Sequence, residues 1–111
     1  MKYFTFSLIV ATYNREKELD CFFNSVACQN YNLDLVEILV VDQNKIINLE
    51  PIIKKYVAKL HIRHIKSDKI GTAHSRNLGI CQASGDIGSF PDDDCLYYDD
   101  TLSSVNSVFN E

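Results

Sequence analysis

The sequence predicts an α/β fold in which a mostly parallel sheet is covered by helices. Apolar segments with strand character alternate with segments whose apolar residues recur at helical spacing, in the order β-α-β-α-β-α-β-α, and no repeat or low-complexity linker interrupts them. A chain of 111 residues with 46% hydrophobic residues can also bury one core without disulfides. We therefore expect a single domain over residues 1–111.

Four segments have the composition of strands. Phe4–Ala11 and Val36–Val41 are almost continuously apolar, which is typical of strands covered on both faces. His61–Lys66 alternates apolar and polar residues, so we expect it nearer the edge of the sheet. Asp86–Phe90 is a shorter strand, and Pro91 ends its hydrogen-bonded ladder.

Helical spacing predicts four helices: Glu16–Gln29, Ile47–Leu60, Gly71–Ser84 and Asp100–Phe109. Asn14 is the expected N-cap of the first helix, and Gly85 is expected to end the third. The third helix also contains Gly79, which costs about 1 kcal/mol relative to alanine. We therefore expect this helix to pack closely on a neighbour.

Composition and charge argue against several classes of protein. The net charge of −4 does not suit a nucleic-acid binder, which needs clustered basic residues. No apolar run approaches the roughly 20 residues that cross a bilayer, and the amino terminus does not resemble a signal peptide, so we expect a cytoplasmic protein. The absence of a CxxC pair predicts reduced, mostly buried thiols rather than a zinc site at the four cysteines, Cys21, Cys28, Cys81 and Cys95.

Polar residues follow three of the predicted strands directly, at the edge where parallel sheets bind ligands. These segments are Thr12-Tyr13-Asn14, Asp42-Gln43-Asn44 and Pro91-Asp92-Asp93-Asp94. Tyr13 offers a ring that could stack on a base or merely cover the sheet edge. Asp42 could accept hydrogen bonds from a nucleobase or ribose, or cap the loop that follows it.

The three consecutive aspartates repel one another unless a positive group compensates them. A hard divalent cation such as Mg²⁺ or Mn²⁺ would do so, because it prefers oxygen ligands and phosphate. The alternative is a solvated acidic turn, but the position directly after a buried strand favours the cation. Arg76, near the start of the third helix, is placed either to bind a diphosphate or to remain a solvated side chain.

Taken together and in order, four segments resemble the nucleotide-sugar-binding half of the family 2 glycosyltransferases: Ile9–Arg15, Ile38–Asp42, Gly71–Gly79 and Phe90–Asp94. The resemblance runs from about Phe4 to Leu102 and implies the GT-A fold, a Rossmann-like three-layer α/β sandwich. It also implies metal-dependent transfer of a sugar, with inversion, from a nucleoside diphosphate to an unknown acceptor. A UDP-sugar is the expected donor.

The resemblance implies roles for the residues after the first two strands and for the third helix. Thr12 and Tyr13 would line the base pocket, and Asp42 would hydrogen-bond the base. Arg76 would lie near the diphosphate.

The aspartates would form the family's DxD motif. Asp92 would be directed at the ribose and would share the metal, while Asp94 would be the main ligand of Mn²⁺ or Mg²⁺. Asp93 would contact the ribose or the sugar. The metal would bridge the two phosphates and stabilise charge on the departing nucleoside diphosphate.

The chain also departs from the family pattern. Asp42-Gln43-Asn44-Lys45 stands where many members have Asp-Asp-Gly-Ser. The family's acceptor-binding half and general base lie downstream of the DxD motif, so we expect a fold truncated after it, with no catalytic base among these residues. This chain alone should then bind a donor but transfer sugar poorly, and it could self-associate through the uncovered side.

Two alternatives come from other classes. A phosphotransferase of the haloacid dehalogenase type carries its DxD loop after the first strand, whereas the cluster here follows the fourth. A receiver-like, non-enzymatic signalling module fits the length and an acidic, cation-binding crevice, but no well-placed lysine follows a fifth strand. Assays with phosphoryl donors and with nucleotide sugars would separate the receiver from the transferase.

Overall fold

The computed structural model describes all residues from 1 to 111 and contains one sheet of four parallel strands. In the spatial order β3-β2-β1-β4, the strands are β3 (His61–Lys66), β2 (Val36–Asp42), β1 (Phe6–Thr12) and β4 (Ile87–Ser89). The register of β1 and β2 places Thr12 beside Asp42 where both strands end. The predicted parallel α/β fold is confirmed, and β3 lies at the sheet edge as expected.

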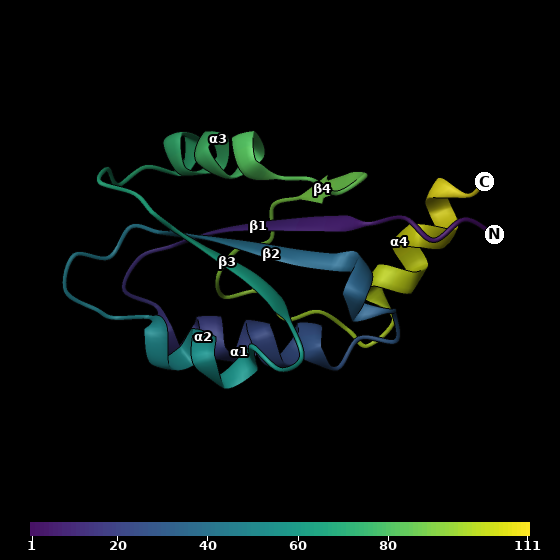
Figure 1. Cartoon of the computed structure of the whole chain (residues 1–111), viewed down its shortest axis with the longest axis horizontal. Helices are drawn as coiled ribbons and strands as arrows, with labels where there is room; N and C mark the ends of the chain where they lie inside the picture. The colour runs from purple at the N-terminus through teal and green to yellow at the C-terminus, as the bar shows by residue number, and fades with distance from the viewer.

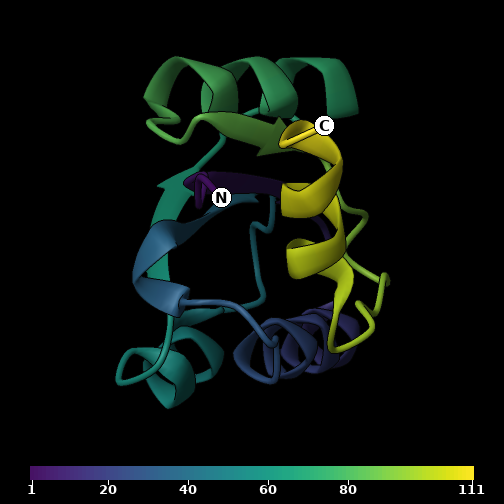
Figure 2. The same cartoon turned by 90° about the vertical axis from the view of Figure 1, so that its right-hand side faces the viewer.

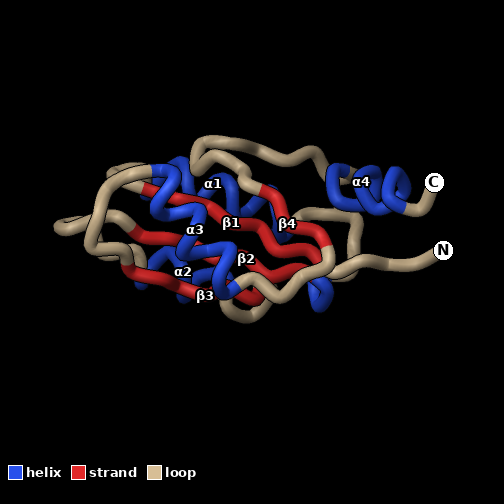
Figure 3. The backbone as a smooth tube through the Cα atoms, turned by 90° about the horizontal axis from the view of Figure 1, so that it is seen from above, coloured by secondary structure: helices blue, strands red, loops and turns tan.

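Helices cover both faces of the sheet, which makes the three-layer sandwich that the sequence implied (Figure 1). In that view α1 (Glu16–Ala27) and α2 (Glu50–Tyr56) lie below the sheet, and α3 (Thr72–Gln82) lies above it. Figure 3 shows α3 from above, lying over the sheet. None of the helices has the length and apolar character needed to cross a membrane.

The last helix, α4 (Thr101–Phe109), lies at the end where the strands begin (Figure 2), as does the short 3₁₀ helix η1 (Leu33–Leu35) that leads into β2. The two termini lie side by side there, and the main-chain amide of Lys2 donates to Asn110 Oδ1 at 2.9 Å. Together, α4 and the termini leave the opposite end of the sheet, where the strands finish, to the loops that carry the candidate site.

The order of the strands defines where a ligand can enter. From β1 the chain steps to β2 and β3 on one side, and then crosses through α3 to β4 on the other side of β1. The direction reverses between β1 and β4, and ligands of such sheets bind beyond the carboxyl ends of the strands at this reversal. These ends lie on the left in Figure 1.

The two faces of the sheet have cores of different size. Sixteen buried residues, among them Phe22 and Phe23 of α1, form the core between the sheet and the helices α1 and α2. The core under α3 has only three buried hydrophobic residues, Ile9, Leu39 and Val41. Gly79 of α3 lies so close to Ile9 that a Cβ there would overlap its side chain, so the close packing expected at this glycine is confirmed.

Several expected helix ends are corrected by the structure. The second helix is shorter than expected, because α2 runs from Glu50 to Tyr56 and not from Ile47 to Leu60. Asn14 does not cap α1: it has a left-handed φ of 56°, and Arg15 takes the cap position without a capping side-chain hydrogen bond. The third helix ends at Gln82, before Gly85. Gly85 instead lies against the main chain of Phe6 and Ser7 in β1, where any side chain would collide.

Helical spacing also predicts inner faces for the last two helices, with Ile80 on that of the third and Val108 and Phe109 on that of the last, and the structure corrects both in part. On α3, Ser75 and Gly79 are buried while Ile80 is exposed, and on α4, Val108 and Phe109 are exposed. Because α3 has few large apolar residues, its neighbours decide which of its faces is buried. The expectation of mostly buried cysteines is wrong as well, because Cys21, Cys28 and Cys81 are exposed and Cys95 is half-buried.

Candidate functional site

The polar residues predicted at three strand ends come together at one edge of the sheet. Thr12 and Asp42 are neighbours in the register of β1 and β2. The loop after β4 reaches the same place, because Arg15, three residues beyond Thr12, forms ion pairs with Asp93 and Asp94. The candidate site therefore lies at the reversal of strand order, between β1 and β4.

Asp42 is fully buried, and each of its two carboxylate oxygens accepts two hydrogen bonds from neighbouring residues. Its Oδ1 accepts from the main-chain amide and the side-chain Nδ2 of Asn44, at 2.9 and 2.8 Å. Its Oδ2 accepts from His64 Nε2 at 2.8 Å and from Lys66 Nζ at 3.0 Å. Burial alone would raise the pKa of Asp42, but these hydrogen bonds together hold that pKa below its ordinary value. Asp42 is thus a fixed negative charge.

Gln43 and Asn44, which replace the second aspartate and the glycine of the family pattern, connect the loops around the site. The Gln43 amide donates to the Thr12 carbonyl at 3.0 Å, and Gln43 Oε1 accepts from the Gly71 amide at 2.7 Å. Asn44 Oδ1 accepts from the Asn14 amide at 2.6 Å. These two buried side chains therefore fix the turn after β1 and the start of α3 relative to β2.

Strand β3 also contributes to this site, which the sequence patterns did not predict. His64 and Lys66 had no assigned function, yet both contact Asp42. Their alternate positions in β3 put them on one face, and the parallel register pairs Lys66 with Asp42. The alternation of polar residues in this strand was the available signal, but only the strand order shows which neighbour they meet.

Two of the three aspartates are held by Arg15. Arg15 Nη1 lies 3.0 Å from Asp94 Oδ2, and Arg15 Nε lies 3.7 Å from Asp93 Oδ1. The side chain of Asp93 is only 12% exposed, and burial raises its pKa; the nearby Thr12 hydroxyl and Arg15 guanidinium counter this effect in part, while Asp94 adds to it. Asp93 is therefore a buried carboxylate with too little positive charge around it.

The chemistry of this loop fits a hard divalent cation. The donors that its side chains offer are all carboxylate oxygens, which hard divalent cations prefer. Asp92 and Asp94 are exposed, so both can turn toward a ligand. The structure gathers no three His, Cys, Asp or Glu side chains around a single point, so the pair Asp92 and Asp94 stays a prediction as metal ligands.

Arg76 and Tyr13 flank the aspartate loop. The guanidinium carbon of Arg76 lies 5.3 Å from the ring centroid of Phe90, which is two residues before Asp92. This cation–π contact brings Arg76 of α3 next to the loop. Tyr13 follows β1 directly and is exposed, so its ring is free to stack on a planar ligand. The roles of these two residues also remain predictions.

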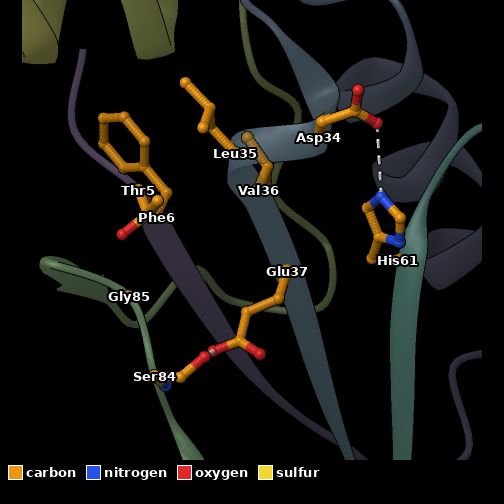
Figure 4. A pocket seen from close by; sticks show the side chains of 9 residues that line it. All are labelled: Thr5, Phe6, Asp34, Leu35, Val36, Glu37, His61, Ser84 and Gly85. Atoms are coloured by element: carbon orange, nitrogen blue, oxygen red, sulfur yellow. Dashed lines mark hydrogen bonds and ion pairs between the residues drawn. The ribbon is translucent and has the colours of Figure 1, made fainter.

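A shallow hollow of about 260 Å³ reaches the aspartate loop, where Asp94 lines it together with Lys17 and Glu18 of α1. The other hollows contain none of the polar residues that follow the strands. The one drawn in Figure 4, of about 280 Å³, is at the opposite end of the sheet, where the strands begin. Glu37 there accepts from Ser7 Oγ at 2.6 Å and from the Ser84 amide at 2.7 Å, and these bonds outweigh burial to lower its pKa. Glu37 thus ties the chain before β4 to the central strands, a structural task.

Comparisons with known proteins agree with the fold. The model of glycosyl transferase family 2 matches residues 7–111. The chain is 32% identical over 108 residues to the poly(ribitol-phosphate) beta-N-acetylglucosaminyltransferase TarS of Staphylococcus aureus, which covers 96% of this chain. It is 28% identical over 110 residues to the minor teichoic acid biosynthesis protein GgaB of Bacillus subtilis, which covers 97% of this chain. The chain spans only 19% of TarS and 12% of GgaB.

Solved structures give the same result. Residues 1–349 of S. aureus TarS in complex with UDP-GlcNAc superpose with a TM-score of 0.89 at 30% identity, over 96% of this chain and 31% of that one. The mannosyltransferase PcManGT of Pyrobaculum calidifontis, in complex with GDP-Man and Mn²⁺, gives a TM-score of 0.85 at 25% identity, over 97% of this chain and 32% of that one. Because the family model matches almost the whole chain and the solved structures share its fold, this chain belongs to glycosyl transferase family 2.

Proposed function

We propose that residues 1–111 form the donor-binding part of a metal-dependent glycosyltransferase, and that the donor is a UDP-sugar bound at the carboxyl edge of the sheet. The observation that carries the proposal is the meeting of Thr12, Asp42 and the aspartate loop at the reversal of strand order. The UDP-GlcNAc bound to the similar TarS structure supports the choice of donor.

In this proposal the turn after β1 receives the nucleobase. Tyr13 stacks on the base, and Thr12 closes the floor of the pocket. Asp42 supports this turn from below: its carboxylate accepts two hydrogen bonds from Asn44. Asn44 Oδ1 in turn accepts a hydrogen bond from the Asn14 amide and so fixes the turn after β1. If an N–H group of the nucleobase hydrogen-bonds Asp42 directly, it must displace one of the four protein groups that now donate to this carboxylate.

The diphosphate lies between Arg76 and the aspartate loop. The Arg76 side chain supplies positive charge from α3, and Asp94, with Asp92, holds Mn²⁺ or Mg²⁺ from the other side. When bound, the divalent cation neutralises the charge that develops on the departing nucleoside diphosphate. The Mn²⁺ in the PcManGT structure supports this requirement, and inversion at the anomeric carbon follows from the family resemblance.

Calorimetric titration of this chain with UDP, GDP and their sugars, with and without Mn²⁺, tests the proposal. We expect UDP and a UDP-sugar to bind, and Mn²⁺ to strengthen that binding. No nucleotide binding under either condition would contradict the proposal. Covalent labelling of an aspartate by a small phosphoryl donor, together with absent nucleotide binding, would favour a receiver-like module instead.

A further inference from the structure

Arg15 occupies a position that the charge of its own helix does not favour. It is the N-cap residue of α1, where the helix dipole repels a cation and prefers an anion. Its backbone φ of −135° is outside the helical range, and no side-chain hydrogen bond caps the helix. The first turn of the helix offers the carboxylates of Glu16 and Glu18, but Arg15 forms an ion pair with neither of them.

The reason lies 79 positions further along the chain. Arg15 Nη1 donates to Asp94 Oδ2 at 3.0 Å, and its Nε lies 3.7 Å from Asp93 Oδ1. One planar guanidinium therefore contacts two consecutive carboxylates of the aspartate loop. The side chain is 48% exposed, which leaves it room to move away.

The charges of this cluster are not balanced by Arg15 alone. Asp92, Asp93 and Asp94 carry three negative charges when ionised, and Arg15 carries one positive charge, so two negative charges remain. The cluster therefore attracts a further cation even while Arg15 is in place. A cation bound to Asp94 would also share its carboxylate with the guanidinium, at a distance where the two positive groups repel each other.

We propose that Arg15 is the internal counterion of the metal site: it holds Asp93 and Asp94 while no metal is bound, and it leaves Asp94 when Mn²⁺ or Mg²⁺ arrives. The inference rests on the proposed function only in that the aspartate loop binds a divalent cation. Arg15 is a positioning residue here, because it sets the conformation and availability of the ligands and does not touch the sugar.

The first test compares Mn²⁺ binding by the nucleotide-free protein, followed by the electron paramagnetic resonance signal of free Mn²⁺. Arg15→Gln removes the competing cation, so we expect it to bind Mn²⁺ about two- to fivefold more tightly than the parent, the size of a partly exposed ion pair. Lys54→Gln makes the same charge change at an exposed residue of α2 that forms no ion pair with the aspartates, and it should leave the affinity unchanged. Arg15→Lys keeps the positive charge, so its Mn²⁺ affinity should lie closer to that of the parent than the affinity of Arg15→Gln does.

Equal or weaker Mn²⁺ binding by Arg15→Gln, with an unchanged thermal midpoint, would overturn the inference and assign Arg15 a purely structural or ligand-supporting role. Equal gains in Arg15→Gln and Lys54→Gln would overturn it too, since net charge would then explain the effect. If the parent protein binds neither Mn²⁺ nor a nucleotide, the proposed function itself is contradicted. That result can be told apart from the two outcomes above, in which the parent does bind Mn²⁺.

Hydrogen exchange supplies a second measurement that does not depend on affinity. Without metal, the loop that contains the Cys95 amide, which donates to the Asp92 carbonyl at 3.0 Å, should exchange faster in Arg15→Gln than in the parent. With saturating Mn²⁺ the two proteins should exchange alike, because the metal replaces the counterion. A difference that persists in saturating Mn²⁺ would show that Arg15 is not displaced.

Discussion

Replacing Asp42 with alanine should lower the free energy of unfolding by about 3 kcal/mol. Asn44 is 3% exposed, and its amide N–H and Nδ2 would both lose their acceptor. A buried donor left without a partner costs about 1–3 kcal/mol, so these two contribute about 2 kcal/mol at the lower bound. The lost bond to the half-buried His64 adds about 1 kcal/mol. Lys66 is 60% exposed and regains water, so it adds little.

Urea unfolding at pH 7 measures this loss, with Lys66→Met as a matched control that removes one donor to the same carboxylate. The control should cost less than about 1 kcal/mol, because the pair that it removes is partly exposed. A loss below about 1 kcal/mol for Asp42→Ala, or equal losses for both variants, would refute the reasoning that Asp42 supports the buried Asn44 loop.

The same variant should change the acid sensitivity of the fold. The folded pKa of Asp42 lies below its ordinary value of 3.8, so its contribution to stability is complete above that value and is lost as the pH falls through the folded pKa. Asp42→Ala should therefore lose less stability than the parent below about pH 4. Some slope will remain, because the pKa values of Asp20 and Glu37 are lowered as well. An identical slope in parent and variant would contradict this assignment.

Three further changes have separable outcomes. Asp94→Asn should weaken nucleoside-diphosphate binding mainly when Mn²⁺ or Mg²⁺ is present, and equal metal-dependent affinity in calorimetry would argue against Asp94 as a ligand. Tyr13→Ala should cost about 1–3 kcal/mol of nucleotide binding with or without metal, and unchanged affinity would leave Tyr13 as a cover for the sheet edge. Gly79→Ala should destabilise the fold by about 1–2 kcal/mol, because overlap with Ile9 exceeds the gain in helix propensity; a raised thermal midpoint would contradict the close packing.

Local patterns were enough to predict the order of the elements. Nearly continuous apolar runs marked the central strands, and helical spacing marked α1, whose apolar residues Leu19, Phe22 and Val26 are buried. Because parallel strands end at a common edge, the polar residues that follow them also located the candidate site. These inferences depend on neighbours in sequence or on a general rule of chain topology.

Faces and helix ends were decided by packing. The sequence of α3 has no broad apolar stripe, so its contact with β1 selected Ser75 and Gly79 as the buried positions. The capping expected of Asn14 failed because its main-chain amide is held by Asn44, in a turn with a left-handed φ. In both places a contact between distant segments outweighed a weak local preference.

The sequence by itself therefore determined the parallel α/β fold, the family and the edge of the sheet at which a ligand would bind. Only the tertiary structure decided which charges meet there: Lys66 with Asp42, and Arg15 with Asp94. These partners come from segments separated by 24 and 79 positions. The sequence shows which side chains are charged, but not which opposite charge each of them meets. Strand order and loop paths decide that, because ion pairs form only between groups that the whole fold brings within a few ångströms.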